Sequence, residues 1–355
     1  MVSLPLDSEE LSSNKFVQTA KRYKNYIIAA AGVVLLFVLV VFTGLWWELK
    51  IALQPLDDTS VCPLAKPIAP ASFYADNSTV LSILNSEKFR VSSAGKLLKA
   101  VQVDTQVGDD QPDVPDAPEL WKKFAKFHTY LSETFPTVFE ELEVTYVNTY
   151  GIVLFWKGTN PKLKPIMLTA HQDVVPVQSA TLDKWTYPPF SGHYDGKFVW
   201  GRGASDCKNV LVGIMETLEL LVAQKFVPER PILAAFGFDE EASGVRGALS
   251  LAKYLEKTFG KDSIFAIVDE GMGLTVDPQT NQIVAQIATG EKGYVDITVS
   301  LKAPGGHSSI PPDHTSIGII GELARDIEAD TFTPLLTDAN PLLKYYQCLA
   351  TYAGD

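Results

Sequence analysis

The middle of the chain contains several short apolar runs. Four of them are almost wholly apolar, and they read IVLFW at 152–156, IMLTA at 166–170, ILAAFGF at 232–238 and IFAIV at 264–268. Runs of this length without polar alternation are typical of strands that are covered on both faces. We therefore expect a sheet whose two faces are both buried.

Helical periodicity occupies the segments around these runs. LWKKFAKFHTYLSETF, at 120–135, repeats apolar residues every three or four positions, and so does the segment 209–224, where Leu211, Ile214, Leu218 and Leu221 form one stripe. Strands separated by helices favour a sheet of mostly parallel strands with helices on its faces. The fold class expected is accordingly α/β with a mostly parallel sheet.

The N-terminal part of the chain contains a longer apolar segment. Residues 25–47 carry no charge, and such a run spans a hydrocarbon core of about 30 Å as one transmembrane helix. Its basic N-terminal flank places residues 1–24 in the cytosol under the positive-inside rule. The run ends in Trp46-Trp47, without small residues of a cleavage site, which favours a retained signal-anchor over a cleaved signal peptide.

Everything after the anchor is then expected on the lumenal side. Residues 48–75 contain several prolines and little periodicity, which predicts a stalk between the membrane and a domain. The acidic, proline-rich segment 104–118 predicts an exposed loop. Asn77-Ser78-Thr79 is a glycosylation sequon that this topology makes available for modification at Asn77.

Composition excludes some functions. The net charge of -12 over 355 residues includes no basic block, so nucleic acid is not expected as a partner. The three cysteines, Cys62, Cys207 and Cys348, lack the pairwise spacing of a metal motif. A bridge between Cys62 and Cys348 is one alternative, and free or intermolecular thiols are favoured over it.

Polar residues follow the apolar runs. Because ligands collect at the carboxyl ends of strands in open α/β sheets, these positions are the candidate site. One imidazole among several carboxylates is the ligand set of a hydrolytic pair of Zn²⁺ ions, which lie about 3.5 to 4 Å apart. The polar groups are His171-Gln172-Asp173, Asp239-Glu240-Glu241, Asp269-Glu270-Gly271 and the segment 201–206, which ends in Asp206.

The positions of these residues suggest roles. His171 is expected to bind one ion, and Asp206, after a glycine-rich loop, is the candidate carboxylate that bridges two ions. Asp173 lies on the same side of an extended segment as His171 and is expected to orient its ring. Of the two adjacent acids, Glu241 is taken as the ligand and Glu240 as the general base.

Each group also has a structural interpretation. A single histidine after a strand is more often a satisfied structural residue, and an acidic pair at a strand end is usually solvated surface or a helix N-cap. The combination is less easily explained in this way, because the four groups follow apolar segments in order. The pattern therefore favours a metal site.

The chain contains five short motifs in order, which read HQDVVPV, WGRGASDCK, DEEASG, VDEG and GGHSS. Together they resemble the co-catalytic zinc peptidases, the family that contains aminoacylase, glutamate carboxypeptidase and carnosinase, and in particular the vacuolar carboxypeptidase S group of fungi. This resemblance implies a zinc-peptidase catalytic domain over residues 76–292 and an inserted α+β lid domain that starts within 293–355. It also implies a vacuolar location and a homodimer that forms through the lid.

The resemblance also implies site residues. Two Zn²⁺ ions would be bound by ligands that include one acid of the DEG motif, and both Asp269 and Glu270 remain candidates. His307, in the GGHSS loop, would lie near the substrate and stabilise the oxyanion. The remaining residues implied by position are the ligands His171, Asp206 and Glu241, the orienting Asp173 and the general base Glu240.

The activity implied is hydrolysis of the amide bond of short peptides or N-acyl amino acids, with release of an amino acid. A metal-bridging water would attack the carbonyl and Glu240 would accept its proton. Two alternatives stay open: a non-catalytic membrane-anchored module of the same fold, and an enzyme that hydrolyses or synthesises N-fatty-acyl amino acids.

One departure concerns the lid. The family's final zinc ligand is a histidine near the C-terminus, and this sequence offers no candidate, since His314 lies beside His307. A lid strand at 294–301 and a helix at about 316–329 are expected, after which the pattern ends. We therefore expect the sequence to be a fragment of a longer protein.

Overall fold

A computed structural model describes residues 21–24, 26, 28–39, 62, 74 and 76–352, except 272, 279, 280, 286, 292 and 294. The chain divides into two compact units. The larger one comprises Ile68–Leu274 with Ala285–Ile287, and the smaller one comprises Met1–Pro67, Thr275–Val284 and Ala288–Asp355. Each unit is described by itself below.

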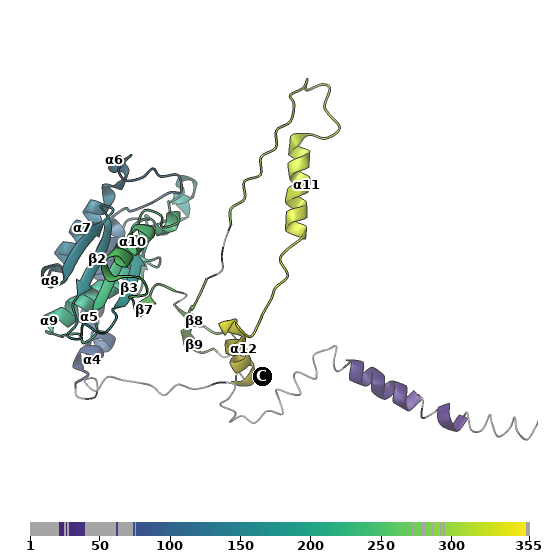
Figure 1. Cartoon of the computed structure of the whole chain (residues 1–355), viewed down its shortest axis with the longest axis horizontal. Helices are drawn as coiled ribbons and strands as arrows, with labels where there is room; N and C mark the ends of the chain where they lie inside the picture. Colours follow the sequence, from purple (N-terminus) through teal and green to yellow (C-terminus); the bar gives the residue numbers. More distant parts are fainter. Residues whose placement is uncertain are drawn as a thin grey trace, which may run out of the picture. The chain divides into compact units, whose positions relative to one another are not determined.

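The larger unit is built on a five-stranded sheet in the order β1-β2-β6-β3-β7 (Figure 1). β3 is parallel to both of its neighbours, β6 and β7, whereas β2 is antiparallel to β6 and to β1. The strands are β1 (Glu143–Val147), β2 (Gly151–Trp156), β3 (Ile166–His171), β6 (Ile232–Gly237) and β7 (Ala266–Val268). All four apolar runs therefore contain strands, as predicted.

The prediction of a mostly parallel sheet is wrong for the β1–β2 half. β1 joins β2 through a tight turn in which Asn148 and Thr149 have φ values of 45° and 72°, and a turn of that length can only produce an antiparallel pair. The connection from β2 to β3, residues 157–165, contains no helix. It is shorter than the dozen or so residues of a parallel crossover, and the sheet is mixed.

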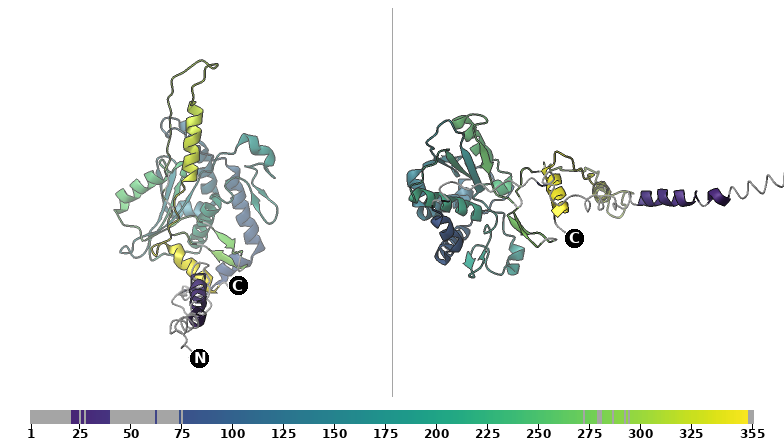
Figure 2. Two further views of the ribbon diagram at one scale, coloured as in Figure 1. Left: turned by 90° about the vertical axis from the view of Figure 1, so that its right-hand side faces the viewer. Right: turned by 90° about the horizontal axis from the view of Figure 1, so that it is seen from below.

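Helices cover both faces of this sheet, as Figure 1 and Figure 2 show. Ile152 and Leu154 of β2 pack in one apolar cluster with residues of α5, α7, α8 and α9, while Val153 packs in another with Leu251 and Leu255 of α10. This alternation is the period of two that a strand imposes. The helices are α5 (Glu87–Gln102), α7 (Lys123–Thr134), α8 (Pro136–Glu141), α9 (Lys208–Ala223) and α10 (Ala248–Phe259).

The two predicted helices in this unit are confirmed. The segment 209–224 corresponds to α9, and 120–135 is divided between α7 and the short α6 (Pro118–Trp121). The acidic segment 104–118 contains no helix before Pro118, and most of its carboxylates are exposed. Val107 and Val114 nevertheless anchor it in a third apolar cluster that includes Trp121.

A buried lysine connects the helices beneath the loop that carries Asp206. The Lys208 side chain, at the start of α9, is fully buried, and its Nζ donates hydrogen bonds to Ala100 O at 3.1 Å and Val103 O at 2.6 Å. These carbonyls lie at the C-terminal end of α5, where helical carbonyls lack intrahelical partners. Lys208 thus ties the start of α9 to the end of α5.

Small elements complete the larger unit. A two-stranded ribbon, β4 (His193–Tyr194) with β5 (Val199–Trp200), precedes the Asp206 loop. The one-turn helix η2 (Glu240–Ala242) follows β6. The others are α4 (Ser78–Asn85) and η1 (Ser179–Lys184).

The smaller unit contains α11 (Ser316–Ala329) and α12 (Pro341–Tyr352), and most of the ribbon of β8 (Leu274–Val276) with β9 (Ile283–Ala285). The helix predicted near 316–329 is confirmed by α11. The strand predicted at 294–301 is not found: residues 295–301 have no regular structure, and 294 lies outside the described residues. A strand requires a paired neighbour, and apolar alternation alone does not supply one.

Cys62 and Cys348 form a disulfide with a Cα–Cα distance of 5.1 Å. The preference for free or intermolecular thiols at these positions is therefore wrong, whereas Cys207 is free and buried. The two half-cystines are 286 residues apart in the sequence but lie in the same compact unit. Sequence spacing cannot reveal such proximity.

One helix, Lys21–Leu39, is long and apolar enough to cross a membrane, with a mean hydropathy of 1.5. It overlaps the predicted span 25–47, whose last part, 40–47, lies outside the described residues. The stalk predicted at 48–75 also lies outside them, except for Cys62 and Tyr74.

Candidate metal centre

His171 occupies the carboxyl end of β3, between β6 and β7. Its side chain is almost fully buried, and Nδ1 donates a hydrogen bond to Asp173 O at 3.0 Å. The other ring nitrogen, Nε2, lies on the opposite side and contacts Asp206 Oδ1 at 3.0 Å. His171 is thereby held in the orientation in which a neutral imidazole offers Nε2 to a metal ion.

Asp173 connects β3 to the segment after β6. One carboxylate oxygen accepts the backbone N–H of Glu240 at 3.1 Å and the other accepts that of Glu241 at 3.0 Å. The first of these oxygens also lies 3.3 Å from His171 Nδ1. A fully buried carboxylate therefore positions the histidine and both adjacent acids at once.

Three carboxylates converge on Nε2 of His171. The Asp206 Oδ1 atom lies 3.0 Å from Nε2, and Glu270 Oε1 lies 3.4 Å away. The Glu240 Oε2 atom lies at 3.8 Å. These acids come from three separate segments: the loop before α9, the segment after β7 and the start of η2.

The potential ligand atoms form two groups in the described part of the chain, each with all atoms within 4.8 Å of one another. One group contains His171, Asp206, Cys207 and Glu270, and the other contains His171, Glu240 and Glu241. Asp206 thus shares a group with Glu270 but not with Glu241.

The structure separates the two acids of the DEG motif. Glu270 belongs to the first group, whereas Asp269 belongs to neither. The Asp269 side chain is exposed and its Oδ1 accepts the backbone N–H of Glu270 at 2.9 Å. The geometry therefore favours Glu270 as the acid that faces the site.

The pKa values of these residues respond to the crowding of negative charge. Burial by itself lowers the pKa of His171, but hydrogen bonds with Asp173 and Cys207 outweigh it and raise the pKa to about 12. Burial, together with the Asp206 carboxylate, raises the pKa of Glu241 to about 7. Burial is also the main cause that raises the pKa of Glu240. The site thus retains protons to offset its charge.

The residues fit a metal ion. Among the described residues, the ion pairs of Asp206, Glu240 and Glu270 are all with His171, and no Lys or Arg pairs with them. A carboxylate cluster around a single imidazole is stable at neutral pH only with additional positive charge. Nitrogen and oxygen donors in this arrangement suit a divalent cation.

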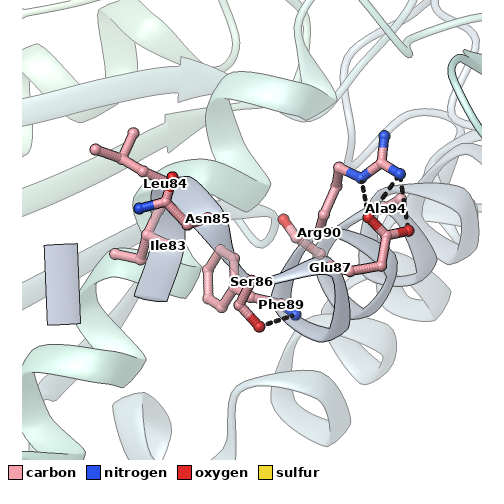
Figure 3. Close-up of a pocket in the computed structure, with 9 residues that line it drawn as sticks. Ile83, Leu84, Asn85, Ser86, Glu87, Phe89, Arg90 and Ala94 are labelled. Carbon is pink, nitrogen blue, oxygen red and sulfur yellow. Dashed lines mark hydrogen bonds and ion pairs between the residues drawn. The ribbon is translucent and has the colours of Figure 1, made fainter. Parts of the chain in front are cut away.

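A pocket at the corner between α4 and α5 offers no comparable set. Figure 3 shows its residues, among which Ser86 Oγ accepts the N–H of Phe89 at 3.2 Å. Its charged side chains, Glu87 and Arg90, pair with each other at 2.7 Å. The charge of this pocket is therefore already neutralised.

The sequence pattern assigns no role to two residues of the site. Cys207 follows Asp206 directly, but the cysteines of this chain lack the pairwise spacing of a metal motif. Gln172, between His171 and Asp173, is fully buried, and its Nε2 donates to Tyr150 O at 2.8 Å and Phe236 O at 3.0 Å. Its position beside His171 was the only available signal.

Neither His307 nor Asn77 is a member of these two groups. His307 belongs to the smaller unit, where its exposed ring accepts the N–H of Ser309 on Nδ1 at 3.3 Å. Asn77 is the N-cap residue of α4, is partly exposed, and makes no side-chain capping hydrogen bond.

A family model described as "Peptidase family M20/M25/M40" matches residues 167–351, which include every segment that contributes to the two groups. The chain belongs to this family. The resemblance to zinc peptidases is thus confirmed.

Relatives of known name show the same similarity. The chain is 44% identical over 294 residues to carboxypeptidase S of Saccharomyces cerevisiae. This match covers 82% of this chain and 50% of the relative. It is 36% identical over 269 residues to the N-fatty-acyl-amino acid synthase/hydrolase of Mus musculus, covering 75% of this chain and 51% of the relative. The chain spans about half the length of these relatives.

Among solved structures, a metallo-carboxypeptidase of Sulfolobus solfataricus is 18% identical, with a TM-score of 0.40. The match covers 51% of this chain and 38% of that chain.

We predict that Asp173→Asn weakens metal binding. The amide cannot accept both backbone N–H groups as a carboxylate does, and it removes the charge next to His171, so affinity for Zn²⁺ should fall by about 10–100-fold. Competition with a chromophoric chelator measures this change. Asp183→Asn, at an exposed position in η1, is the control, and equal affinities in both variants would contradict the assigned role.

We predict that His128 makes stability depend on pH. Burial lowers the pKa of His128 below its ordinary value of 6.5, and its Nε2 lies 3.0 Å from Gln172 Oε1. The unfolded chain therefore binds the proton first, so the free energy of unfolding should decrease as the pH falls from 6.5 to the folded-state pKa.

His128→Gln keeps a donor near Gln172 but cannot titrate. Urea unfolding at a series of pH values should show a smaller slope for His128→Gln than for the unsubstituted chain in this window. Identical slopes would show that His128 makes no such contribution.

Proposed function

We propose that this chain carries the metal-binding half of a zinc-dependent metallopeptidase that hydrolyses the amide bond of short peptides or N-acyl amino acids and releases an amino acid. The observation that carries the proposal is the convergence of Asp206, Glu240 and Glu270 on Nε2 of His171. The name of the yeast relative, carboxypeptidase S, supports the same activity.

We assign the ligand role to the groups that the structure brings together. His171, Asp206 and Glu270 would hold one Zn²⁺ ion, and Glu241 would contribute to a second ion. The bridging role expected for Asp206 stays a prediction, because the structure groups Asp206 with Glu270 and not with Glu241. Bound Zn²⁺ would polarise the substrate carbonyl and lower the pKa of the attacking water.

Glu240 is the proposed general base. Its carboxylate is about half exposed, so water and substrate can reach it, while its backbone is fixed by Asp173. It accepts a proton as the water oxygen bonds to the carbonyl carbon, and then delivers that proton to the amine nitrogen as the C–N bond breaks. Burial raises the pKa of Glu240 in the metal-free site, whereas a bound cation would lower it.

Glu240→Gln should reduce hydrolysis of an N-blocked dipeptide by at least about 10²-fold, because the amide cannot accept a proton. Bound zinc, measured by atomic absorption, should remain unchanged. Glu256→Gln, an exposed position on α10, is the control and should keep full activity.

The same measurements separate the enzyme from a non-catalytic module. Stoichiometric zinc without turnover in the unsubstituted chain would favour the module, and turnover that persists in Glu240→Gln would refute the assigned base.

The second candidate is hydrolysis or synthesis of N-fatty-acyl amino acids. The name of the mouse relative suggests it. We predict that a panel of N-blocked dipeptides and N-fatty-acyl amino acids, compared by kcat/KM, will favour the peptides. A preference for the fatty-acyl compounds would select the second candidate.

We further propose that residues 25–47 anchor the protein in the vacuolar membrane with residues 1–24 in the cytosol. In this topology the catalytic domain is lumenal. His307 would stabilise the substrate oxyanion, and residues 293–355 would contribute to a homodimer. The helix Lys21–Leu39, which is long and apolar enough to cross a membrane, supports the anchor.

A lumenal domain predicts glycosylation at Asn77. Thr79→Ala destroys the sequon and should abolish the mobility shift that an endoglycosidase causes, whereas Ser78→Ala preserves the sequon and should retain the shift. A cytosolic domain would show no shift in the unsubstituted chain either.

A further inference from the structure

A small cavity lies between α5, α9 and the β4–β5 ribbon. Its volume is about 230 Å³, which is below the roughly 300–1,000 Å³ typical of pockets for drug-sized ligands. The apolar lining residues Leu97, Val199 and Val212 are buried or half-buried, whereas the cations Arg90 and Lys197 are exposed. None of the described residues that line the cavity is Asp or Glu. An apolar wall therefore adjoins uncompensated positive charge.

Lys197 supplies most of this charge. The acid two residues before it, Asp195, accepts the backbone N–H groups of Lys197 and Phe198 on one oxygen. Its other oxygen accepts the indole N–H of Trp200 at 2.7 Å. The Lys197 ammonium group lies instead 4.9 Å from the centroid of the Phe198 ring and forms no ion pair with the part of the chain that the structure describes. Its charge is therefore available to an anion.

Arg90 brings a second cation to the cavity from α5. Its guanidinium pairs with Glu87 at 2.7 Å, as Figure 3 shows, so its net charge is offset. Two of its N–H groups donate to Glu87 and one donates to Gly196 O. A guanidinium has further N–H groups, which can donate to a carboxylate beside Lys197.

Gly213 leaves open space in the lining. It lies in the middle of α9, where glycine destabilises a helix relative to alanine. Steric crowding does not require glycine here, because a Cβ atom at this position would have no heavy atom within 4 Å. The space above Gly213 belongs to the cavity, and an alkyl group fits into it.

We propose that this cavity binds a small aliphatic carboxylate. The carboxylate lies at Lys197 and Arg90, and the alkyl chain lies against Leu97, Val212 and the open space at Gly213. A free amino acid fits less well, because its ammonium group finds no acid in the lining. The site shares no residue with the two groups of the candidate metal centre, so this inference does not depend on the proposed function.

The probe is hexanoate, and 1-hexanol is the matched control because it has the same chain without the charge. The full chain is held in phosphatidylcholine nanodiscs, with empty nanodiscs as the blank, and is freed of metal with a chelator so that no bound metal captures the carboxylate. Saturation-transfer NMR should show saturable binding of hexanoate, about tenfold tighter than that of hexanol, because hydrogen bonds to a charged group are lost with the alcohol. Leucine should bind more weakly than hexanoate.

Two variants locate the site. Lys197→Gln should weaken the binding of hexanoate about tenfold and leave that of hexanol unchanged. Lys253→Gln, at an exposed position on α10, is its control. Gly213→Leu should abolish binding because it fills the cavity. Gly95→Leu is its control, since Gly95 is also a glycine within a helix that has open space but lies outside this cavity.

The absence of saturable hexanoate binding to the unsubstituted chain would overturn the proposal, and so would unchanged affinity in Lys197→Gln. Equal affinities for hexanoate and hexanol would overturn the role of the cations, and tighter binding of leucine would overturn the ligand class. If Gly213→Leu does not fold, Lys197→Gln decides alone, because it changes only an exposed side chain.

Discussion

The buried carboxylate of Asp173 is the interaction on which the candidate site depends. It lies beside His171 Nδ1 and accepts the backbone N–H groups of Glu240 and Glu241. Charge-assisted hydrogen bonds of this kind are short and strong when water is excluded. The end of β3 and the start of η2 are thus held as one rigid frame, on which one imidazole and two acids take fixed positions.

The sheet brings the remaining ligands to this frame. β3, β6 and β7 are parallel neighbours, so their carboxyl ends, and the acids after them, meet at one edge. The antiparallel β1–β2 half contributes none of the grouped side chains. Lys208 stabilises the loop that carries Asp206. Its side chain ties the start of α9, directly after that loop, to the end of α5. The mixed sheet therefore has a parallel functional half.

The negative charge of the candidate site favours the binding of a cation. Four carboxylates, those of Asp206, Glu240, Glu241 and Glu270, share one imidazole within the two groups. Burial and the neighbouring carboxylates raise the pKa of Glu241 to about 7, and hydrogen bonds with Asp173 and Cys207 raise that of His171 to about 12, so both side chains hold protons more tightly than in water. A divalent cation would replace these protons and satisfy the charge. The free energy of cation binding would then stabilise an arrangement that repels itself without one.

Periodicity and residue order by themselves determined four strands, two helices and the polar groups that follow the strands, because apolar runs and helical stripes are local patterns. These elements are β2, β3, β6, β7, α9 and α11. Strand direction, the partner of Cys62, the absence of a strand at 295–301 and the distinction between Asp269 and Glu270 required tertiary structure. Each of these depends on which distant segments become neighbours, and a linear pattern does not contain that information. The contact between Cys207 and His171 arises in the same way, since only the folded chain places the sulfur against the backbone N–H of His171.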